Sequence, residues 1–166
     1  MKAENLKILI IRFSSIGDIV LTTPVIRCLK TQLPGAEIHY LSKKNFKDVL
    51  VANPYIDKLH LLGKSLSTTI SDLQKENFDL VIDLHNNLRT LIIKTRLGVK
   101  SKSFDKLNWQ KWLLVNFKVH RMPTIHIVDR YLDTVRSLGI ENDDQGLDYF
   151  LNTEHDLGTL LPSTHH

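Results

Sequence analysis

The sequence predicts an α/β domain in which a parallel β-sheet carries helices on both faces. Continuous apolar runs at residues 6–13 (LKILIIRF) and 79–84 (DLVIDL) are typical of strands buried on both sides. Apolar segments of strand length alternate with segments of helical periodicity, which indicates βαβ units. The 166 residues, 42% hydrophobic and 24% charged, suffice for one domain with its own core. The expected architecture is therefore Rossmann-like.

The first half of the pattern is a strand, a loop and a helical stretch. The strand at residues 6–13 is followed by a short polar loop at 14–18 and by a helical pattern that runs to Leu33. Pro24 lies inside this pattern. Either Thr23 caps a new helix with Pro24 at its first position, or one helix kinks there.

The remaining segments continue the alternation. Further strands are predicted at residues 36–41, 58–62, 79–84 and 99–104. Further helices are predicted at residues 45–52, 68–76, 88–97, 107–117 and 125–138. Gly98 and Gly139 end two of these helices, since glycine readily adopts the left-handed conformation that follows many helices. We expect this domain to occupy residues 1–150 and residues 151–166 to begin a linker to a further domain.

The cysteine content and the length of the apolar stretches indicate the cellular compartment. Cys28 is the single cysteine, so an internal disulfide is impossible, which fits a reducing compartment. No apolar stretch approaches the roughly 20 residues of a membrane span. We therefore expect a cytoplasmic protein.

The charge distribution predicts an anionic partner. Nine Lys or Arg and one acid lie between Arg89 and Arg121, although the formal net charge of the whole chain is only +4. Within this stretch, residues 106–121 mix lysines with Trp109 and Trp112. That mixture suits peripheral contact with an anionic membrane, or else an ordinary core-packing helix. No recognition motif supports nucleic-acid binding.

The first candidate site follows the first strand. Ligands of open parallel sheets bind beyond the carboxyl ends of the strands, and a helix start favours anions. After Arg12, Ser14 and Ser15 offer hydroxyl donors, Gly17 permits close approach of a ligand to the backbone, and Asp18 is placed to act as a general base. The alternative is that Asp18 only caps the helix and the serines only form a turn.

The second candidate site follows the strand at residues 79–84. In a sheet ordered 3-2-1-4-5 this strand lies beside the first one, so the two loops face one crevice. His85, Asn86 and Arg89 are candidates for binding hydroxyls and an anionic group. The alternative is again capping of the following helix, by Asp83 or Asn87.

Two classes of site are not predicted. A dinucleotide fingerprint needs three glycines where this chain has only Gly17, which argues against a nucleotide-dependent oxidoreductase. The eight histidines include no H-x-x-x-H pair, and one cysteine cannot build a thiolate zinc site, so no metal site is expected.

These motifs together resemble a known family. Residues 8–24 (ILIIRFSSIGDIVLTTP) are similar to the N-terminus of the ADP-heptose:lipopolysaccharide heptosyltransferases, glycosyltransferase family 9. The similarity covers nearly the whole chain in the right order. It continues at residues 34–38, 53–57, 78–89 and 126–139. The Ser-Ser-x-Gly-Asp block is its most specific element.

The resemblance implies the N-terminal half of a GT-B enzyme with two Rossmann-like domains. This half would hold the acceptor, an anionic sugar on lipid A, while the ADP-heptose donor would bind a C-terminal domain. Transfer would invert the anomeric centre without a metal or other cofactor, and the chain alone would be inactive. Asp18 matches the general base, with Ser14, Ser15 and Gly17 in the same site. The expected acceptor-binding residues are Arg12, Ser14, Ser15, Gly17, His85, Asn86 and Arg89.

The chain also departs from the resembled pattern. The family often has lysine at the position of Arg12 and a Gln-Gly pair at the positions of His85 and Asn86. These departures bear on the identity of the acceptor rather than on the class of reaction. Two other interpretations remain open: a non-catalytic Rossmann-like binding module, and a glycosyltransferase for another surface polysaccharide.

Overall fold

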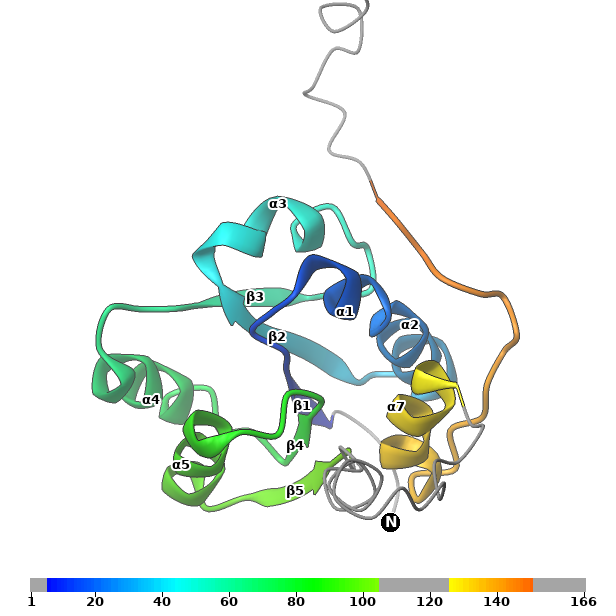
Figure 1. Ribbon diagram of the computed structural model, residues 1–166. Coiled ribbons are helices and arrows are strands. Elements are labelled where there is room, and N and C mark those ends of the chain that lie inside the picture. Colours follow the sequence, from blue (N-terminus) through cyan, green and yellow to red (C-terminus); the bar gives the residue numbers. More distant parts are fainter. Residues whose placement is uncertain (1–5, 105–125, 151–166) are drawn as a thin grey trace, which may run out of the picture.

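Five parallel strands form a single sheet. The structure, a computed structural model, describes residues 6–104 and 126–150. The strand order is β3-β2-β1-β4-β5 (Figure 1), which confirms the predicted order. The strands are β1 (Lys7–Ile11), β2 (Glu37–Lys43), β3 (Lys58–Leu62), β4 (Leu80–Asp83) and β5 (Lys100–Ser103). The two apolar strands, β1 and β4, lie side by side away from both edges, as expected.

Helices cover both faces of this sheet. In chain order the helical segments are α1 (Ile16–Val20), α2 (Thr23–Gln32), the 3-10 turn η1 (Lys44–Phe46), α3 (Lys47–Leu50), α4 (Leu66–Gln74), α5 (Leu88–Leu97) and α7 (Ile127–Arg136). Helices α2 and α7 pack together on one face, and α4 and α5 pack together on the other (Figure 1). The arrangement is the predicted Rossmann-like one.

Strand β1 shows why its sequence is apolar throughout. Ile8 and Ile10 belong to the core cluster beneath α2 and α7, whereas Leu9 and Ile11 belong to the cluster beneath α4 and α5. All four side chains are fully buried. Because successive residues of a strand point to opposite faces, a strand covered on both sides needs apolar side chains at every position.

Pro24 divides the helical stretch that follows β1. Helix α1 ends at Val20 and α2 begins at Thr23, so the expectation of a fresh helix at the proline is confirmed. The N-cap residue is Thr22 rather than Thr23. The predicted cap is therefore wrong by one residue, because the proline occupies the second helical position. The predicted loop is also too long at its C-terminal end, since Asp18 lies in the first turn of α1.

A segment without regular secondary structure follows α7 and lies along α2 (Figure 1). One arginine of α2 holds it. Arg27, whose side chain is only 3% exposed, pairs with Asp143 at 2.7 Å and with Asp148. Its Nη2 also donates to the carbonyl oxygen of Gly146 at 3.0 Å. A buried cation thus holds the segment around Asp143 and Asp148 against the domain.

Some predictions fall elsewhere in the chain. The predicted helix at residues 107–117, the basic stretch at 106–121 and the linker at 151–166 lie outside the described residues. Neither described range contains a helix that is both long enough and apolar enough to cross a membrane.

Candidate active site

The two predicted site segments meet at the carboxyl ends of β1 and β4. Ile11 and Asp83 are register partners in these strands, so the loops that follow leave the same edge of the sheet. Arg12 connects the loops, because its Nη1 donates to the carbonyl oxygen of Leu84. The Leu84 amide in turn donates to the carbonyl oxygen of Ile11 at 3.1 Å. The predicted neighbourhood of the two segments is confirmed.

Asp18 is held through one of its two carboxylate oxygens. Oδ2 accepts hydrogen bonds from the Ser15 amide at 3.0 Å and from Ser15 Oγ at 2.9 Å. The same oxygen lies 2.7 Å from Nη2 of Arg12. Among the described residues nothing donates to Oδ1 of Asp18, and the side chain is 36% exposed. The carboxylate is therefore fixed in place with one oxygen directed at no protein donor.

The pKa of Asp18 lies below its ordinary value. Partial burial raises this pKa, but the hydrogen bonds from Ser15 and the charge and hydrogen bond of Arg12 together outweigh burial. Asp18 is consequently ionised near pH 7, which is the form that a general base requires. The bond from the Ser15 amide at the N-cap position also stabilises the start of α1, so the capping and site interpretations of Asp18 are compatible.

Arg12 is buried and positions the other groups. Its Nε donates to the carbonyl oxygen of Ser14 at 2.8 Å, so the guanidinium contacts both site loops as well as Asp18. On its far side the guanidinium lies 5.8 Å from the centre of the Tyr131 ring of α7, a distance at which cation–π attraction operates. Sequence reasoning missed Tyr131, because nothing local places α7 beside the end of β1.

Asp83 organises the second loop. Its Oδ1 accepts the amides of His85 at 3.1 Å and Asn86 at 2.7 Å. Its Oδ2 lies 2.7 Å from Nζ of Lys94, which lies on α5. Asp83 is fully buried, and a buried carboxylate needs such a partner. This need for a cation was the one feature of the sequence that could have pointed to Lys94. Of the two predicted caps, Asn87 is the residue that caps α5, through Thr90.

Asn86 adopts a left-handed backbone conformation, with φ of 48°. Glycine and asparagine tolerate this conformation best, so asparagine suits the position where the resembled pattern often has glycine. The Asn86 side chain also donates to the carbonyl oxygen of Phe104 at 2.9 Å, which ties the loop to the end of β5. These contacts fold the loop, and the ring of neighbouring His85 packs 4.9 Å from that of Phe13.

Arg89 is exposed on the first turn of α5, outside the hydrogen-bonded group around Arg12 and Asp18. The structure thus brings together Arg12, Ser14, Ser15, Asp18 and the backbone of the second loop. Arg89 takes no part in this group, and its binding of an anionic group depends on how far a ligand extends along α5. The sequence prediction for each residue's role stays a prediction.

Gly17 leaves open space at the start of α1, where a Cβ atom would meet nothing within 4 Å. We therefore expect Gly17→Ala to raise the free energy of unfolding by about 0.5 kcal/mol, since alanine favours helix. Urea denaturation measures this change. Gly63→Ala is the matched control, because its Cβ would lie 3.3 Å from Thr69 Oγ1 and should destabilise the fold. A destabilised Gly17→Ala variant would contradict the open space around this position.

Comparison with known proteins gives two curated relatives, and no protein-family model matches the chain. The chain is 30% identical over 118 residues to lipopolysaccharide heptosyltransferase 1 of Campylobacter coli, covering 68% of this chain and 34% of that protein. It is 29% identical over 140 residues to lipopolysaccharide heptosyltransferase 3 of Escherichia coli K12, covering 75% and 40%. The chain therefore spans well under half the length of either relative.

Solved structures share the fold. A glycosyltransferase family 9 protein from Veillonella parvula DSM 2008 superposes with a TM-score of 0.72 at 21% identity, covering 99% of this chain and 52% of that one. Escherichia coli heptosyltransferase WaaC, solved with ADP-2-deoxy-2-fluoro heptose, superposes with a TM-score of 0.65 at 22% identity, covering 86% and 51%. The fold defines a Rossmann-like domain of the GT-B type. Together with the curated relatives, it assigns the chain to the heptosyltransferase-like sequences of glycosyltransferase family 9.

Proposed function

We propose that this chain is the N-terminal, acceptor-binding half of an inverting glycosyltransferase. The full-length enzyme would transfer heptose from ADP-heptose to an acceptor in the lipopolysaccharide core. Two heptosyltransferase relatives support the reaction class. The observation that carries the proposal is the carboxylate of Asp18, which is ionised, partly exposed and held at the carboxyl end of a central strand.

In the proposed reaction Asp18 is the general base. Its Oδ1 takes the proton of an acceptor hydroxyl as that oxygen attacks the anomeric carbon of the donor sugar. The new carbon–oxygen bond forms while the bond to ADP breaks, and ADP leaves from the opposite face with its electron pair, which inverts the centre. Arg12 and Ser15 keep Oδ2 in place throughout. The leaving diphosphate would be bound by a C-terminal domain.

The groups around Asp18 suit a hydroxylated, anionic acceptor. Ser14 and His85 border the same edge of the sheet and offer polar groups for sugar hydroxyls. Arg89 offers an exposed guanidinium beside the start of α5, where the helix N-terminus also favours an anion. We therefore propose that these residues, with Asn86 shaping the loop, bind the acceptor.

The proposal is tested with the full-length protein, ADP-heptose and a lipopolysaccharide core acceptor that lacks the heptose. We expect release of ADP and a product whose anomeric configuration, read by NMR, is opposite to that of the donor. Other nucleotide sugars and other surface polysaccharides serve as alternative substrates. A product with retained configuration would contradict the inverting mechanism, and transfer only to another polysaccharide would contradict the proposed acceptor.

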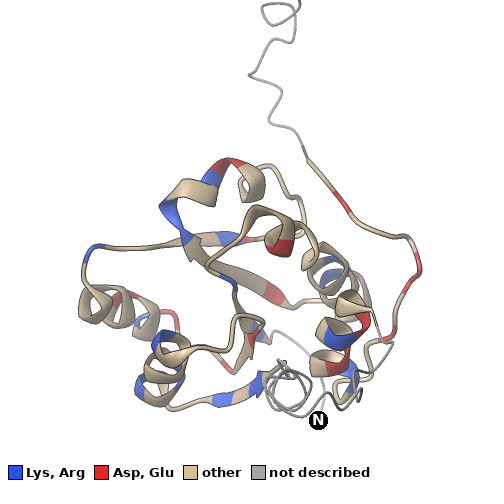
Figure 2. Ribbon diagram, in the orientation of Figure 1, with Lys and Arg blue, Asp and Glu red and all other residues tan. Residues whose placement is uncertain are grey.

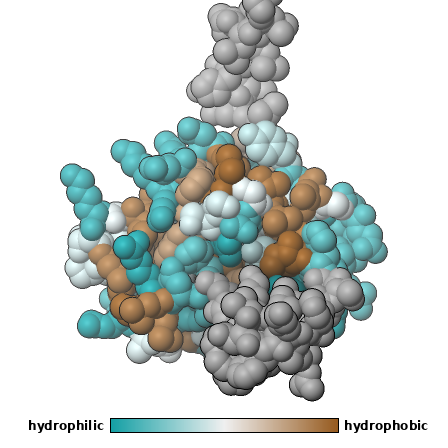
Figure 3. All heavy atoms as spheres, in the orientation of Figure 1, coloured by the Kyte–Doolittle hydropathy of each residue, from teal (hydrophilic) through white to brown (hydrophobic). Residues whose placement is uncertain are grey.

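We also propose that α5 and β5 place the site against an anionic membrane on its cytoplasmic side. Figure 3 shows apolar side chains gathered over α5, and Figure 2 shows positive charge on α5 and β5. The exposed apolar side chains of α5 are Leu88, Leu91 and Ile92. The exposed cations are Arg89, Arg96, Lys100 and Lys102. Apolar side chains flanked by cations suit an interface with anionic lipid.

Removing part of this charge should weaken vesicle binding. Lys100→Gln with Lys102→Gln should lower partitioning onto anionic vesicles roughly 30-fold in low salt, at about 1 kcal/mol for each cation. Cosedimentation with phosphatidylglycerol vesicles measures the effect, which should shrink as salt screens the attraction. Lys44→Gln with Lys64→Gln makes the same change of charge at exposed positions elsewhere and should have little effect. Equal binding to neutral and anionic vesicles would refute the proposal.

A further inference from the structure

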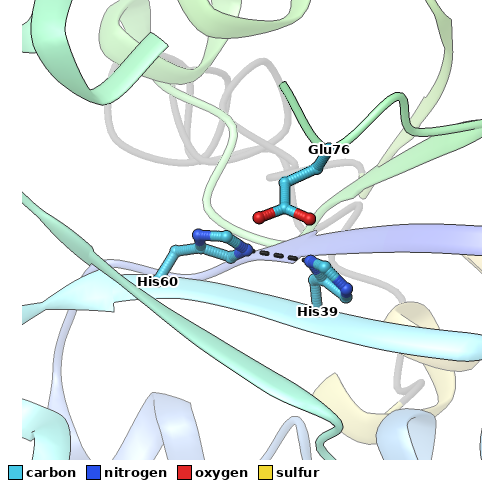
Figure 4. A group of neighbouring side chains, drawn as sticks. All are labelled: His39, His60 and Glu76. Carbon is cyan, nitrogen blue, oxygen red and sulfur yellow. Dashed lines mark hydrogen bonds between the residues drawn. The ribbon is translucent and has the colours of Figure 1, made fainter. Parts of the chain in front are cut away.

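Three potential metal ligands meet on the α4 and α5 face of the sheet (Figure 4). They are His39 of β2, His60 of β3 and Glu76, which follows α4. One donor atom from each lies within 4.8 Å of the others, and His39 Nδ1 is 2.8 Å from His60 Nε2. Within the described ranges this is the one such group of three. It uses the side of β2 that faces Phe78, whereas Asp18 lies beyond the carboxyl end of β1.

A neighbouring carboxylate orients the first of these rings. Oε1 of Glu37 lies 2.6 Å from Nε2 of His39, so that nitrogen carries the proton and donates it. The lone pair of Nδ1 therefore accepts the hydrogen bond from Nε2 of His60, and a metal ion would take the place of that proton. Metal-binding histidines commonly have this arrangement, in which the second ring nitrogen donates to a carboxylate that fixes the tautomer. His39 is fully buried, which holds the ring in this orientation.

The surroundings also suit a metal ion. Phe78 packs edge-on against both imidazole rings, at 5.1 Å from His39 and 6.1 Å from His60, and so forms an apolar wall. Two imidazoles and one carboxylate form a donor set that zinc accepts, with water in the fourth position.

Two lysines compete for the carboxylates. Glu76 pairs with Lys58 through Oε1 and lies 3.7 Å from Lys7 through Oε2. Lys7 also lies 3.3 Å from Glu37. The Lys58 side chain is 53% exposed, so it can turn into water when Glu76 turns toward a cation. Binding therefore requires Glu76 to exchange a surface ion pair, which is worth little, for a metal.

We infer that His39, His60 and Glu76 form a binding site for a divalent metal ion of the zinc type. A bound ion would link β2, β3 and the connection between α4 and β4, three segments that are separated in the sequence. The site would thus stabilise the fold and is independent of the proposed transfer reaction. Imidazole ligands favour Zn²⁺, and also Cu²⁺ and Ni²⁺, over Mg²⁺ and Ca²⁺.

The test is titration of the metal-free chain with Zn²⁺ by calorimetry, and with Co²⁺ by visible absorption. Every protein carries His165→Ala and His166→Ala, which removes the adjacent histidines at the end of the sequence. We expect one Zn²⁺ ion to bind per chain and to raise the melting temperature. Bound Co²⁺ should show the intense visible absorption that is typical of tetrahedral coordination by four ligands. Mg²⁺ should produce neither the heat nor the stabilisation.

Variants separate this site from other histidines. His60→Gln and Glu76→Gln should each weaken Zn²⁺ binding at least 10-fold, and Glu37→Gln should weaken it about 10- to 100-fold. Lys58→Gln should instead tighten binding about 2- to 5-fold, because it removes the competing cation. His126→Gln, at the exposed N-cap of α7, is the matched control and should bind as the parent does. Absence of Zn²⁺ binding, or equal binding by the parent and His60→Gln, would overturn the inference.

Discussion

Replacing Asp18 with asparagine in the full-length enzyme should lower the transfer rate by about 10² to 10⁴, the usual contribution of a general base. Asparagine keeps the shape of the side chain and can still accept the Ser15 amide at the start of α1. It cannot take a proton from the acceptor hydroxyl. Measuring kcat for ADP release, with acceptor saturating, isolates this effect from binding.

Stability measurements distinguish catalysis from capping. The variant loses its ion pair with Arg12, but the guanidinium keeps the carbonyl oxygens of Ser14 and Leu84. The Asp18 side chain is also partly solvated, so we expect a loss of unfolding free energy of about 1 kcal/mol or less. Ser15→Ala is the control: it removes one hydrogen bond to Oδ2, keeps the carboxylate, and should slow transfer less than tenfold.

Two outcomes would count against Asp18 as the base. Near-normal turnover by Asp18→Asn would exclude it, and His85 and Asp83 would be the next residues to test. Equal losses of activity in Asp18→Asn and Ser15→Ala, each with a large loss of stability, would reduce Asp18 to a helix cap.

Replacing Arg27 with methionine should lower the free energy of unfolding by about 3 kcal/mol, since breaking a buried ion pair leaves charges without their partner. Arg27 is almost completely buried between α2 and the segment that carries Asp143 and Asp148. Methionine fills a similar volume but offers no donor. The segment around Gly146 should therefore detach, and its amides should exchange hydrogen faster than those of β1 and β4.

A second cation of α2 provides the control. Lys30 pairs with Asp57 at 2.7 Å, but its side chain is 29% exposed. Lys30→Met should therefore cost about 1 kcal/mol or less, as is usual for an ion pair near the surface. Urea denaturation of both variants compares the two costs. Equal losses of unfolding free energy would show that burial does not determine the strength of the Arg27 ion pairs.

Acid should release the same segment. Hydrogen bonds from Arg27 lower the pKa of Asp143 to about 2, from an unfolded value near 4. A lowered pKa in the folded state contributes stability that is fully present above pH 4 and is lost as the pH falls toward 2. Hydrogen exchange at residues 140–150 should therefore accelerate over this range. The Arg27→Met variant should lack this part of the pH dependence, because its Asp143 has no cation to lower the pKa.

Local sequence signals predicted the α/β class, the parallel sheet and most element positions. The strand order was expected from the common doubly wound arrangement rather than from a local signal. Runs in which nearly every residue is apolar identify β1 and β4 as strands buried on both faces. The strand β3 was predicted at its observed bounds, residues 58–62. The candidate base was also within reach of the sequence, because ligands bind at the carboxyl ends of central strands and Asp18 follows β1 by a few residues. The element positions depend on contacts between residues close in the sequence, which hydrophobic periodicity reports directly.

Tertiary structure alone decided which charged groups pair. Arg12 reaches Leu84 and Asp83 reaches Lys94 because β1 and β4 are register partners and α5 returns over their face. Arg27 meets Asp143, 116 residues away, only because α7 packs on α2 and directs the following segment along it. Buried charges require partners, but strand register and helix packing determine which distant residue supplies each one.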